Sequence, residues 1–295
     1  MKGIILAGGA GSRLYPTSAI YSKQLTIIYD KPMIYYPLSV LMLASIKEIL
    51  IISNSETLPF YKKLFQNGND IGLKIEYALQ NKPRGLADAF IVGKKFIGSD
   101  DVTMILGDNI FYGNLNFVRD AVQNNIGATV FGYHVENPKS FGVVEFDDES
   151  NVVSIEEKPD NPKSNYAVVG LYVYNNEIVE IAENLKPSAR GELEITDVNK
   201  EYLKRNKLYV KLFGRGVAWL DTGTPRTLLD ASSFFGALED RQGLKVACIE
   251  EVAYMMNCIN RKQFKELIGK IPNSSYKEYL ENIYNDRTLY QEYQK

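Results

Sequence analysis

A glycine-rich loop and two cationic side chains stand near the beginning of the chain. Residues 2–23 read KGIILAGGAGSRLYPTSAIYSK. The apolar run at the start is typical of a buried parallel strand, and it breaks into three glycines, Gly8, Gly9 and Gly11. Glycine lets backbone N–H groups approach an anion closely, and Arg13 and Lys23 supply positive charge for phosphate oxygens. The loop therefore predicts a phosphate site.

This loop matches neither of the two common glycine motifs. A Walker loop needs a Gly-Lys-Ser/Thr ending, and Arg13 and Leu14 stand where that ending fails. A dinucleotide fingerprint that began at Gly9 would need its third glycine at Leu14. The glycines alone leave a plain strand-to-helix turn open as the alternative.

Polar residues also follow two later apolar runs. Asp108 stands in the run LGDN, where an acid has few structural roles apart from that of an ordinary turn residue. Gln80 and the run PRGL (83–86) follow the segment KIEYAL. A glutamine amide offers a hydrogen-bond donor and an acceptor together.

The composition excludes several other kinds of chemistry. The single histidine, His134, argues against paired-histidine zinc sites and against Ser-His-Asp or Cys-His machinery. The net charge of −2, from 34 basic and 36 acidic residues, argues against a general nucleic-acid surface. Cys248 and Cys258 form no CxxC motif, and we expect structural thiols. Chemistry is therefore expected to rest on carboxylates, cations, backbone amides and a hard metal ion.

The overall character of the sequence is that of an ordinary globular protein. Of its 295 residues, 45% are hydrophobic and 24% are charged. The sequence shows no apolar stretch of membrane-spanning length and no secretory leader, and we expect a cytoplasmic protein.

Strands and helices alternate in the first half of the chain. The patterns predict strands at 3–7, 48–53, 74–79 and 102–106, with helices at 33–45, 57–65 and 86–96. This alternation implies right-handed crossovers, so we expect an α/β, Rossmann-like fold with a mostly parallel central sheet flanked by helices. Ligands bind beyond the carboxyl ends of such strands. The glycine loop, Gln80 and Asp108 each follow a strand there, which predicts a binding crevice.

The second half of the chain follows a different pattern. We expect strands at 128–135, 142–147, 152–158, 166–174 and 209–213, and helices at 177–183 and 194–205. These strands are interpreted as a mixed extension of the same sheet that covers the crevice. The end of the chain is helical and polar, at 227–240, 261–269 and 275–284. Its tyrosines form either a packed face or an oligomer contact; they are Tyr276, Tyr279, Tyr284, Tyr290 and Tyr293.

The order of several motifs resembles that of the sugar-1-phosphate nucleotidyltransferases, and within them the thymidylyltransferase group. After GGAGSRLYP and SKQL come DKPMIYYPLSVLMLA (30–44), LGDNIF (106–111), EEKP (156–159), NYAVVGLY (165–172), ARGELEITDVN (189–199) and WLDTGT (219–224). The resemblance covers roughly the first 255 residues. It implies the fold of nucleotide-diphospho-sugar transferases, with a mixed-sheet sugar-binding half and a helical C-terminal extension.

The resemblance also implies roles for individual residues. Asp108 and Asp221 would be the magnesium ligands. Arg13, Lys23 and Lys158 would act on the phosphates during catalysis. Nucleotide contacts are implied for Leu6, Gly8, Gly9, Gly11, Gln80 and Gly85. Sugar contacts are implied for Gly142, Glu157, Lys158, Val168 and Glu192, whereas we expect Trp219 to be a core residue.

The implied activity is transfer of a thymidylyl group from dTTP to glucose 1-phosphate, which gives dTDP-glucose and pyrophosphate with Mg²⁺ as cofactor. Alternatives are the same chemistry with UTP, CTP or another sugar 1-phosphate, a nucleotide-sugar glycosyltransferase, and a noncatalytic nucleotide-sugar sensor. A glycosyltransferase normally uses Asp-x-Asp, and the sequence Asp108-Asn109-Ile110 lacks the second acid. The family suggests a homotetramer.

The resemblance suggests how the chain is divided. A nucleotidyltransferase core would span residues 1–240, with a nucleotide-binding part at 1–135 and a sugar-binding part at 136–240. Residues 241–295 would form a helical extension with an oligomer contact and a possible regulatory site. Relatives carry a motif like ACPEEIAYR at a second nucleotide site, and here 247–255 read ACIEEVAYM, with Met255 in place of arginine. Further departures from the family pattern are Ala10, Ser12, Arg84 and Phe141.

Overall fold

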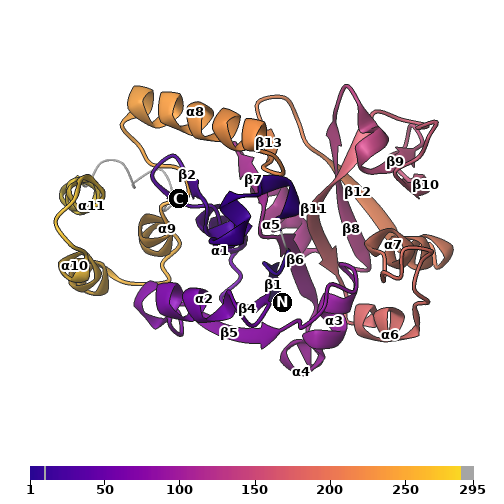
Figure 1. Ribbon diagram of the computed structural model, residues 1–295, viewed down its shortest axis with the longest axis horizontal. Coiled ribbons are helices and arrows are strands. Elements are labelled where there is room, and N and C mark those ends of the chain that lie inside the picture. Colours follow the sequence, from indigo (N-terminus) through magenta and orange to yellow (C-terminus); the bar gives the residue numbers. More distant parts are fainter. Residues whose placement is uncertain (10, 287–295) are drawn as a thin grey trace.

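Strand β1 (Lys2–Leu6) lies inside a nine-stranded sheet. The computed structural model describes residues 1–9 and 11–286, and Figure 1 shows their arrangement. β1 is parallel to β4 (Glu48–Ser53) on one side and to β6 (Val102–Leu106) on the other. β5 (Lys74–Leu79) continues the parallel order beyond β4. The parallel sheet and the four predicted strands of the first half are confirmed.

Strand β11 (Tyr166–Tyr174) joins the second half of the chain to this sheet, because it pairs antiparallel with β6. The path of the sheet is β10-β9-β11-β6-β1-β4-β5, and β8 pairs with both β11 and β12. The remaining strands are β8 (Ala128–His134), β9 (Gly142–Phe146), β10 (Val152–Glu157) and β12 (Leu208–Leu212). The prediction of a mixed extension of the same sheet is therefore confirmed.

Helices cover both faces of the sheet, since successive side chains of a strand point to opposite faces. Ile5 belongs to the core beneath one set of helices, and Ile4 belongs to the core on the other face. The first set is α1 (Tyr35–Leu43), α2 (Leu58–Phe65) and α5 (Asn116–Gln123). The second set is α3 (Asp88–Val92), α4 (Lys94–Ile97), α6 (Glu177–Asn184) and α7 (Ile195–Lys204).

Two features of the first half differ from the sequence prediction. The helix expected at 86–96 is divided at Gly93, where a Cβ atom would lie 2.9 Å from the Ala89 carbonyl oxygen and 3.1 Å from Ile4 Cδ1. The close approach to β1 explains why glycine stands there and why the helix breaks. Helix α5 was not expected, because most of its residues are polar and its buried face, around Val118, is short.

A separate two-stranded sheet was also not expected. β7 (Asn109–Tyr112) pairs antiparallel with β13 (Ala218–Asp221), and Asp221 lies opposite Asn109 in the register. A short hairpin, β2 (Ile27–Ile28) with β3 (Lys31–Pro32), lies under helix α8 (Pro225–Gln242). Short 3-10 turns lie at Ser12–Leu14, Thr17–Ala19, Lys23–Leu25, Asn69–Ile71 and Pro138–Ser140.

The C-terminal helices α9 (Ile249–Met255), α10 (Arg261–Lys270) and α11 (Ser275–Asn285) gather at the end of the molecule opposite β9 and β10 (Figure 1). Tyr276 and Tyr279 point inward and donate hydrogen bonds of 2.6 Å to Glu250 and Glu251. Tyr284 packs beside Phe264. These three tyrosines contribute to a packed face, whereas Tyr290 and Tyr293 lie outside the described residues. None of the helices in the described part is both long and apolar enough to cross a membrane.

A buried cluster of charges fixes helix α8 to the β2–β3 hairpin. Lys31 is only 2% exposed, and its Nζ lies 3.0 Å from Glu239 Oε1 near the end of α8. Asp30 forms ion pairs with Lys31 and with Lys245. The backbone N–H of Val246 also donates to Glu239, at 2.8 Å. The cluster therefore connects the hairpin, α8 and the segment that leads to α9.

We predict that Lys31→Met lowers the free energy of unfolding by about 3 kcal/mol, because removing one partner leaves buried carboxylates under-compensated. Lys74→Met is the matched control, since Lys74 is 62% exposed and its ion pairs with Glu48 and Glu76 lie in water. This control should leave stability nearly unchanged. Urea unfolding of both variants measures the difference, and equal losses would contradict the role of the cluster.

Candidate functional site

The glycine loop begins where β1 ends, at the carboxyl edge of the parallel sheet. The N–H of Gly107 donates to the Leu6 carbonyl oxygen at 3.0 Å, so the loop lies beside the end of β6. A Cβ atom on Gly8 would lie 3.7 Å from Gln80 Oε1, which brings the end of β5 to the same place. The prediction that these three strand ends share one edge is therefore confirmed.

Lys23 and Arg13 face this edge from the segment after the loop. Lys23 is 6% exposed, and its Nζ lies 2.5 Å from Asp108 Oδ2. Gly11 has φ +61°, and a Cβ there would lie 3.2 Å from Lys23 Cβ, so the loop closes over the lysine. Arg13 lies against the segment after Asp221, since a Cβ on Gly223 would be 2.5 Å from Arg13 Nη2. Lys23 therefore reaches Asp108, and Arg13 approaches the segment that follows Asp221.

Asp108 and Asp221 are brought together by the small sheet of β7 and β13. Thr222, which follows Asp221, donates its hydroxyl to the Asp108 carbonyl oxygen at 2.9 Å. Burial raises the pKa of the Asp221 carboxyl above its usual value, and the charge of Asp108 raises it further. Lys23 and Arg13 act in the opposite direction. The two carboxylates thus share one electrostatic environment.

Asn109 fixes the position of Asp108 through hydrogen bonds to three segments, a role that sequence reasoning missed. Its Oδ1 accepts the N–H of Gly170 at 3.0 Å and the indole N–H of Trp219 at 2.7 Å. Its Nδ2 donates to Asp108 Oδ1 at 3.1 Å. Trp219 packs against Tyr133 and Phe141, as expected of a core residue, and its indole N–H also orients Asn109. The only sequence signal was the position of Asn109 directly after the acid.

Gln24 is a second residue that sequence reasoning missed. It is 3% exposed and lies between the loop and the end of β6. A Cβ atom on Gly9 would lie 3.7 Å from Gln24 Nε2, and a Cβ atom on Gly107 would lie 2.9 Å from Gln24 Cγ. Ser22 donates its hydroxyl to Gln24 Oε1 at 3.0 Å. Its place directly after Lys23 was the available signal.

The donor set of this edge suits a hard divalent cation. Magnesium commonly takes one or two carboxylates and completes its shell with water and substrate phosphates. Asp108 and Asp221 supply two carboxylates, and among the residues of 1–9 and 11–286 no group of three or more metal-binding side chains gathers. A cation would also relieve the like charge that raises the pKa of Asp221.

Residues predicted to contact a sugar converge at the other end of the sheet. Gly142 in β9 lies opposite Glu157 in β10. A Cβ on Gly142 would lie 3.5 Å from Glu157 Oε2 and 3.8 Å from Val168 Cβ. Thr196, which sequence reasoning missed, donates its hydroxyl to Glu157 Oε2 at 2.6 Å. Glu157 Oε1 lies 3.6 Å from Nζ of the half-exposed Lys158 and 3.8 Å from Nη2 of Arg190.

The residues predicted to contact the nucleotide and those predicted to contact the sugar meet at Gly85 and Leu193. Gly85 has φ +99°, and a Cβ there would lie 2.3 Å from the Leu193 carbonyl oxygen. The N–H of Leu193 donates to the Arg84 carbonyl oxygen at 2.7 Å, and that of Ala87 donates to Leu193 at 3.1 Å. The half-buried Glu192 precedes Leu193, so this contact places it next to the nucleotide side.

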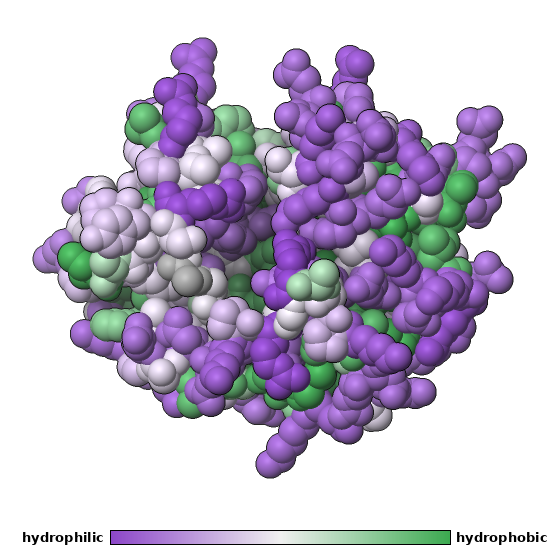
Figure 2. All heavy atoms as spheres, turned by 45° about the vertical axis from the view of Figure 1, so that its right-hand side comes forward, coloured by the Kyte–Doolittle hydropathy of each residue, from purple (hydrophilic) through white to green (hydrophobic). Residues whose placement is uncertain are grey.

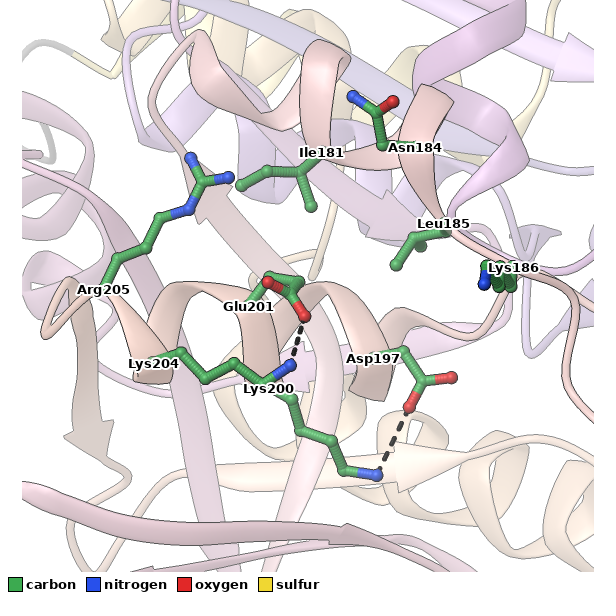
Figure 3. Close-up of a pocket in the computed structure, with 9 residues that line it drawn as sticks. All are labelled: Ile181, Asn184, Leu185, Lys186, Asp197, Lys200, Glu201, Lys204 and Arg205. Carbon is green, nitrogen blue, oxygen red and sulfur yellow. Dashed lines mark hydrogen bonds and ion pairs between the residues drawn. The ribbon is translucent and has the colours of Figure 1, made fainter.

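An open hollow lies away from this edge. It has a volume of about 470 Å³ and lies between α6 and α7, as Figure 3 shows. Four of its charged side chains form two ion pairs: Lys200 lies 3.3 Å from Asp197, and Lys204 lies 2.5 Å from Glu201. It contains none of the residues discussed above, and we do not assign it to the candidate site.

Hydrophilic side chains cover most of the face in Figure 2, and hydrophobic side chains appear there in separate patches. Such a face favours polar contacts over the docking of a large apolar ligand.

Comparison with known proteins gives a consistent result. The family model described as "Nucleotidyl transferase" matches residues 2–237. The glucose-1-phosphate thymidylyltransferase of Neisseria meningitidis serogroup A is 52% identical over 282 residues, which are 95% of this chain and 98% of that protein. That of Mycobacterium tuberculosis is 51% identical over 281 residues, with the same coverage of both chains.

Solved structures agree with these relatives. A Bacillus anthracis protein described as a glucose-1-phosphate thymidylyltransferase, in complex with sucrose, superposes with a TM-score of 0.74 and 40% identity. The match covers 79% of this chain and 94% of that one. A UDP-glucose pyrophosphorylase complexed with UDP-glucose gives a TM-score of 0.71 and 25% identity, and it covers 80% of this chain and 98% of that one.

We predict that Gly85→Ala is more destabilising than Gly98→Ala by about 2 kcal/mol, because only the first adds a clash to backbone strain. Both glycines have positive φ, but a Cβ on Gly98 would meet nothing within 4 Å. Thermal and urea unfolding of the two variants measure the difference. Equal losses of stability would show that the contact between Gly85 and Leu193 is not tight.

Proposed function

The chain belongs to the nucleotidyl transferase family and, within it, to the glucose-1-phosphate thymidylyltransferases, and we propose that it makes dTDP-glucose. The reaction joins dTTP and glucose 1-phosphate and releases pyrophosphate. One observation carries this proposal at the level of the site: Arg13, Lys23, Asp108 and Asp221 converge beside the glycine loop. A noncatalytic sensor would have no need of this set of charges.

The nucleotide is proposed to bind along the ends of β1 and β5. The base is proposed to contact the backbone of Leu6 and Gly8, the side chain of Gln80 and Gly85, and the proximity of Gly8 to Gln80 Oε1 supports this. Gly9 and Gly11 leave the loop open to phosphate oxygens, because no side chain obstructs their N–H groups.

The sugar phosphate is proposed to bind between β9, β10 and α7. Glu157 accepts hydroxyl groups of the glucose through a carboxylate that Thr196 holds in place. Gly142 and Val168 contribute backbone contacts, and Glu192 lies next to the contact between the two halves. Lys158 is half exposed and free to turn from Glu157 to the phosphate, which it positions as a point charge.

Asp108 and Asp221 are proposed to hold Mg²⁺, which lowers the barrier by neutralising the charge that develops on the transferring phosphoryl group. Both carboxylates are oriented in advance, one by Asn109 and Lys23 and the other by the β7–β13 register. This advance orientation matters because a site that is already ordered spends no energy on rearrangement during the reaction.

The residues of the chain supply the remaining chemistry. The glucose 1-phosphate oxygen attacks the α-phosphorus of dTTP in line, and the bond to pyrophosphate breaks. Arg13 and Lys23 stabilise the negative charge on the phosphate oxygens, and Lys158 holds the attacking phosphate in position. A phosphate monoester is already ionised near neutral pH, so no histidine base is needed. No covalent enzyme intermediate is required.

We further propose the division of the chain into a core at 1–240, with its nucleotide-binding part at 1–135 and its sugar-binding part at 136–240, and a helical extension at 241–295. Helix α9 of the extension packs on α1 and on the turn at Asn69–Ile71, and α10 and α11 pack on α9 and on each other, at the end of the molecule opposite β9 and β10. A homotetramer is the assembly that we propose from the resemblance, to be checked by light scattering.

The test of the function is to incubate the protein with magnesium, glucose 1-phosphate and one nucleotide at a time. We expect pyrophosphate and dTDP-glucose with dTTP. Product with UTP or CTP in preference to dTTP would indicate the same chemistry on another base. Absence of pyrophosphate with every nucleotide would support a noncatalytic binding protein.

Asp108→Asn and Asp221→Asn should each lower magnesium-dependent turnover by about a thousandfold, since each removes one charged contact to the transition state. Asp70→Asn is the matched control, because Asp70 is 51% exposed and pairs only with Lys270 among the ion pairs of the described residues. The control should retain full activity. Near-normal turnover of Asp108→Asn at saturating magnesium would refute the metal assignment.

Regulation at the extension is proposed to be weak. Met255 cannot pair with a phosphate as an arginine would, which removes a contact of roughly 2 kcal/mol. Arg261 is an unsuitable substitute, since its guanidinium stacks on Tyr284 and donates to the Tyr284 carbonyl at 3.0 Å. We expect weak inhibition by dTDP-rhamnose and stronger inhibition of Met255→Arg. Potent noncompetitive inhibition of the unmodified protein, unchanged by the substitution, would contradict this.

A further inference from the structure

A buried carboxylate lies directly behind Gln80. Asp88 opens helix α3 and is only 3% exposed. Its Oδ2 accepts a hydrogen bond of 2.9 Å from Gln80 Nε2. Its Oδ1 lies 3.6 Å from Nε of Arg84, a side chain that is 62% exposed. Both oxygens of this acid therefore face donors, one at the site and one at its rim.

This contact determines which way the amide of Gln80 points. A carboxylate can only accept hydrogen bonds, so the amide must present its NH₂ group to Asp88. The opposite orientation would place two acceptors against each other in a nearly dry environment, which is unfavourable. Gln80 Oε1 is accordingly directed toward the glycine loop, 3.7 Å from where a Cβ of Gly8 would be.

The backbone around Asp88 keeps it in this place. Residues on both sides of Gly85 are hydrogen-bonded to Leu193, through the Arg84 carbonyl at 2.7 Å and the Ala87 N–H at 3.1 Å. Asp88 follows Ala87 directly, so the start of α3 cannot move away from Gln80 without breaking this pairing. The carboxylate is thus a fixed reference point for the amide.

We propose that Asp88 is a positioning residue that determines base specificity, because it locks the Gln80 amide in the orientation that fits thymine and uracil and rejects cytosine. The proposal rests on the proposed function, in which Gln80 contacts the base. Asp88 itself does not touch the nucleotide.

The reason lies in the edges of the bases. Thymine and uracil present an N3–H donor beside a carbonyl oxygen. An amide in the observed orientation matches this edge, because Oε1 can accept from N3–H and the second N–H of Nε2 can donate to the carbonyl oxygen of the base. Cytosine presents a bare N3 acceptor beside an amino group, so it would need the amide turned over. Asp88 opposes that turn. The contact does not distinguish thymine from uracil, because it does not involve the 5-methyl group of thymine.

The test is to measure the affinity of Asp88→Asn for dTTP, dUTP and dCTP by calorimetry with magnesium present. An asparagine can accept or donate, so both orientations of Gln80 become allowed. The preference for dTTP over dCTP should fall by at least about tenfold, and the ratio of dTTP to dUTP should remain within about twofold. An equal loss of affinity for all three nucleotides would overturn the proposal, since it would indicate a merely structural role of Asp88.

A double-mutant cycle with Gln80→Ala separates the two residues. In the Gln80→Ala background, Asp88→Asn should have no further effect on the ratio of dTTP to dCTP. A full additional effect would show that Asp88 acts without Gln80 and would overturn the inference. Asp70→Asn serves as the control for an Asp-to-Asn change and should leave all three affinities unchanged.

The unmodified protein gives an independent measurement that does not depend on the folding of any variant. N3-methyl-dTTP lacks the N3–H group and should bind at least about tenfold more weakly than dTTP. Equal binding of dTTP, N3-methyl-dTTP and dCTP would overturn the proposal. Because these are binding measurements, selective binding without pyrophosphate release would contradict the proposed function and still support the role of Asp88.

Discussion

One buried amide, that of Asn109, connects the three parts of the chain on which the site depends. It is 4% exposed, and its oxygen accepts from Gly170 in β11 and from Trp219 in β13. Its nitrogen donates to Asp108 at the end of β6. An unpaired buried amide would be costly, so the three partners hold one another in a single arrangement. The parallel sheet, its mixed extension and the β7–β13 sheet thereby meet at the acids.

The two negative and two positive side chains at this edge compensate one another. Two carboxylates repel each other, which is part of why the pKa of Asp221 is raised, and Lys23 and Arg13 compensate. Lys23 is buried and close to Asp108, while Arg13 is exposed and approaches from the side of Gly223. In the proposed function, the two cations would face phosphate oxygens and the two carboxylates would hold a cation. A surface ion pair of the same composition would be weaker, because water would screen it.

The two halves of the molecule meet through backbone atoms. Gly85 approaches the backbone of Leu193 so closely that no other residue fits, and hydrogen bonds from Leu193 and Ala87 close the contact. The same contact supports Asp88 and, through it, Gln80. In the proposed function, this contact would link selection of the base to the position of the second half of the chain, although the residues concerned are far apart in the sequence.

The sequence alone predicted the parallel strands, the strand-end location of the glycine loop, Gln80 and Asp108, and the mixed second half. Local patterns suffice for these, since apolar runs and glycines act over a few residues. The family resemblance implied the pairing of Asp108 with Asp221, whereas the roles of Asn109, Gln24, Thr196 and Asp88, and the break at Gly93, came only from the tertiary structure. These depend on contacts between segments that are distant in the chain, such as Asn109 with Gly170 and Trp219. No periodicity within one segment encodes such contacts, because the partner of a buried polar group is chosen by the packing of the whole fold.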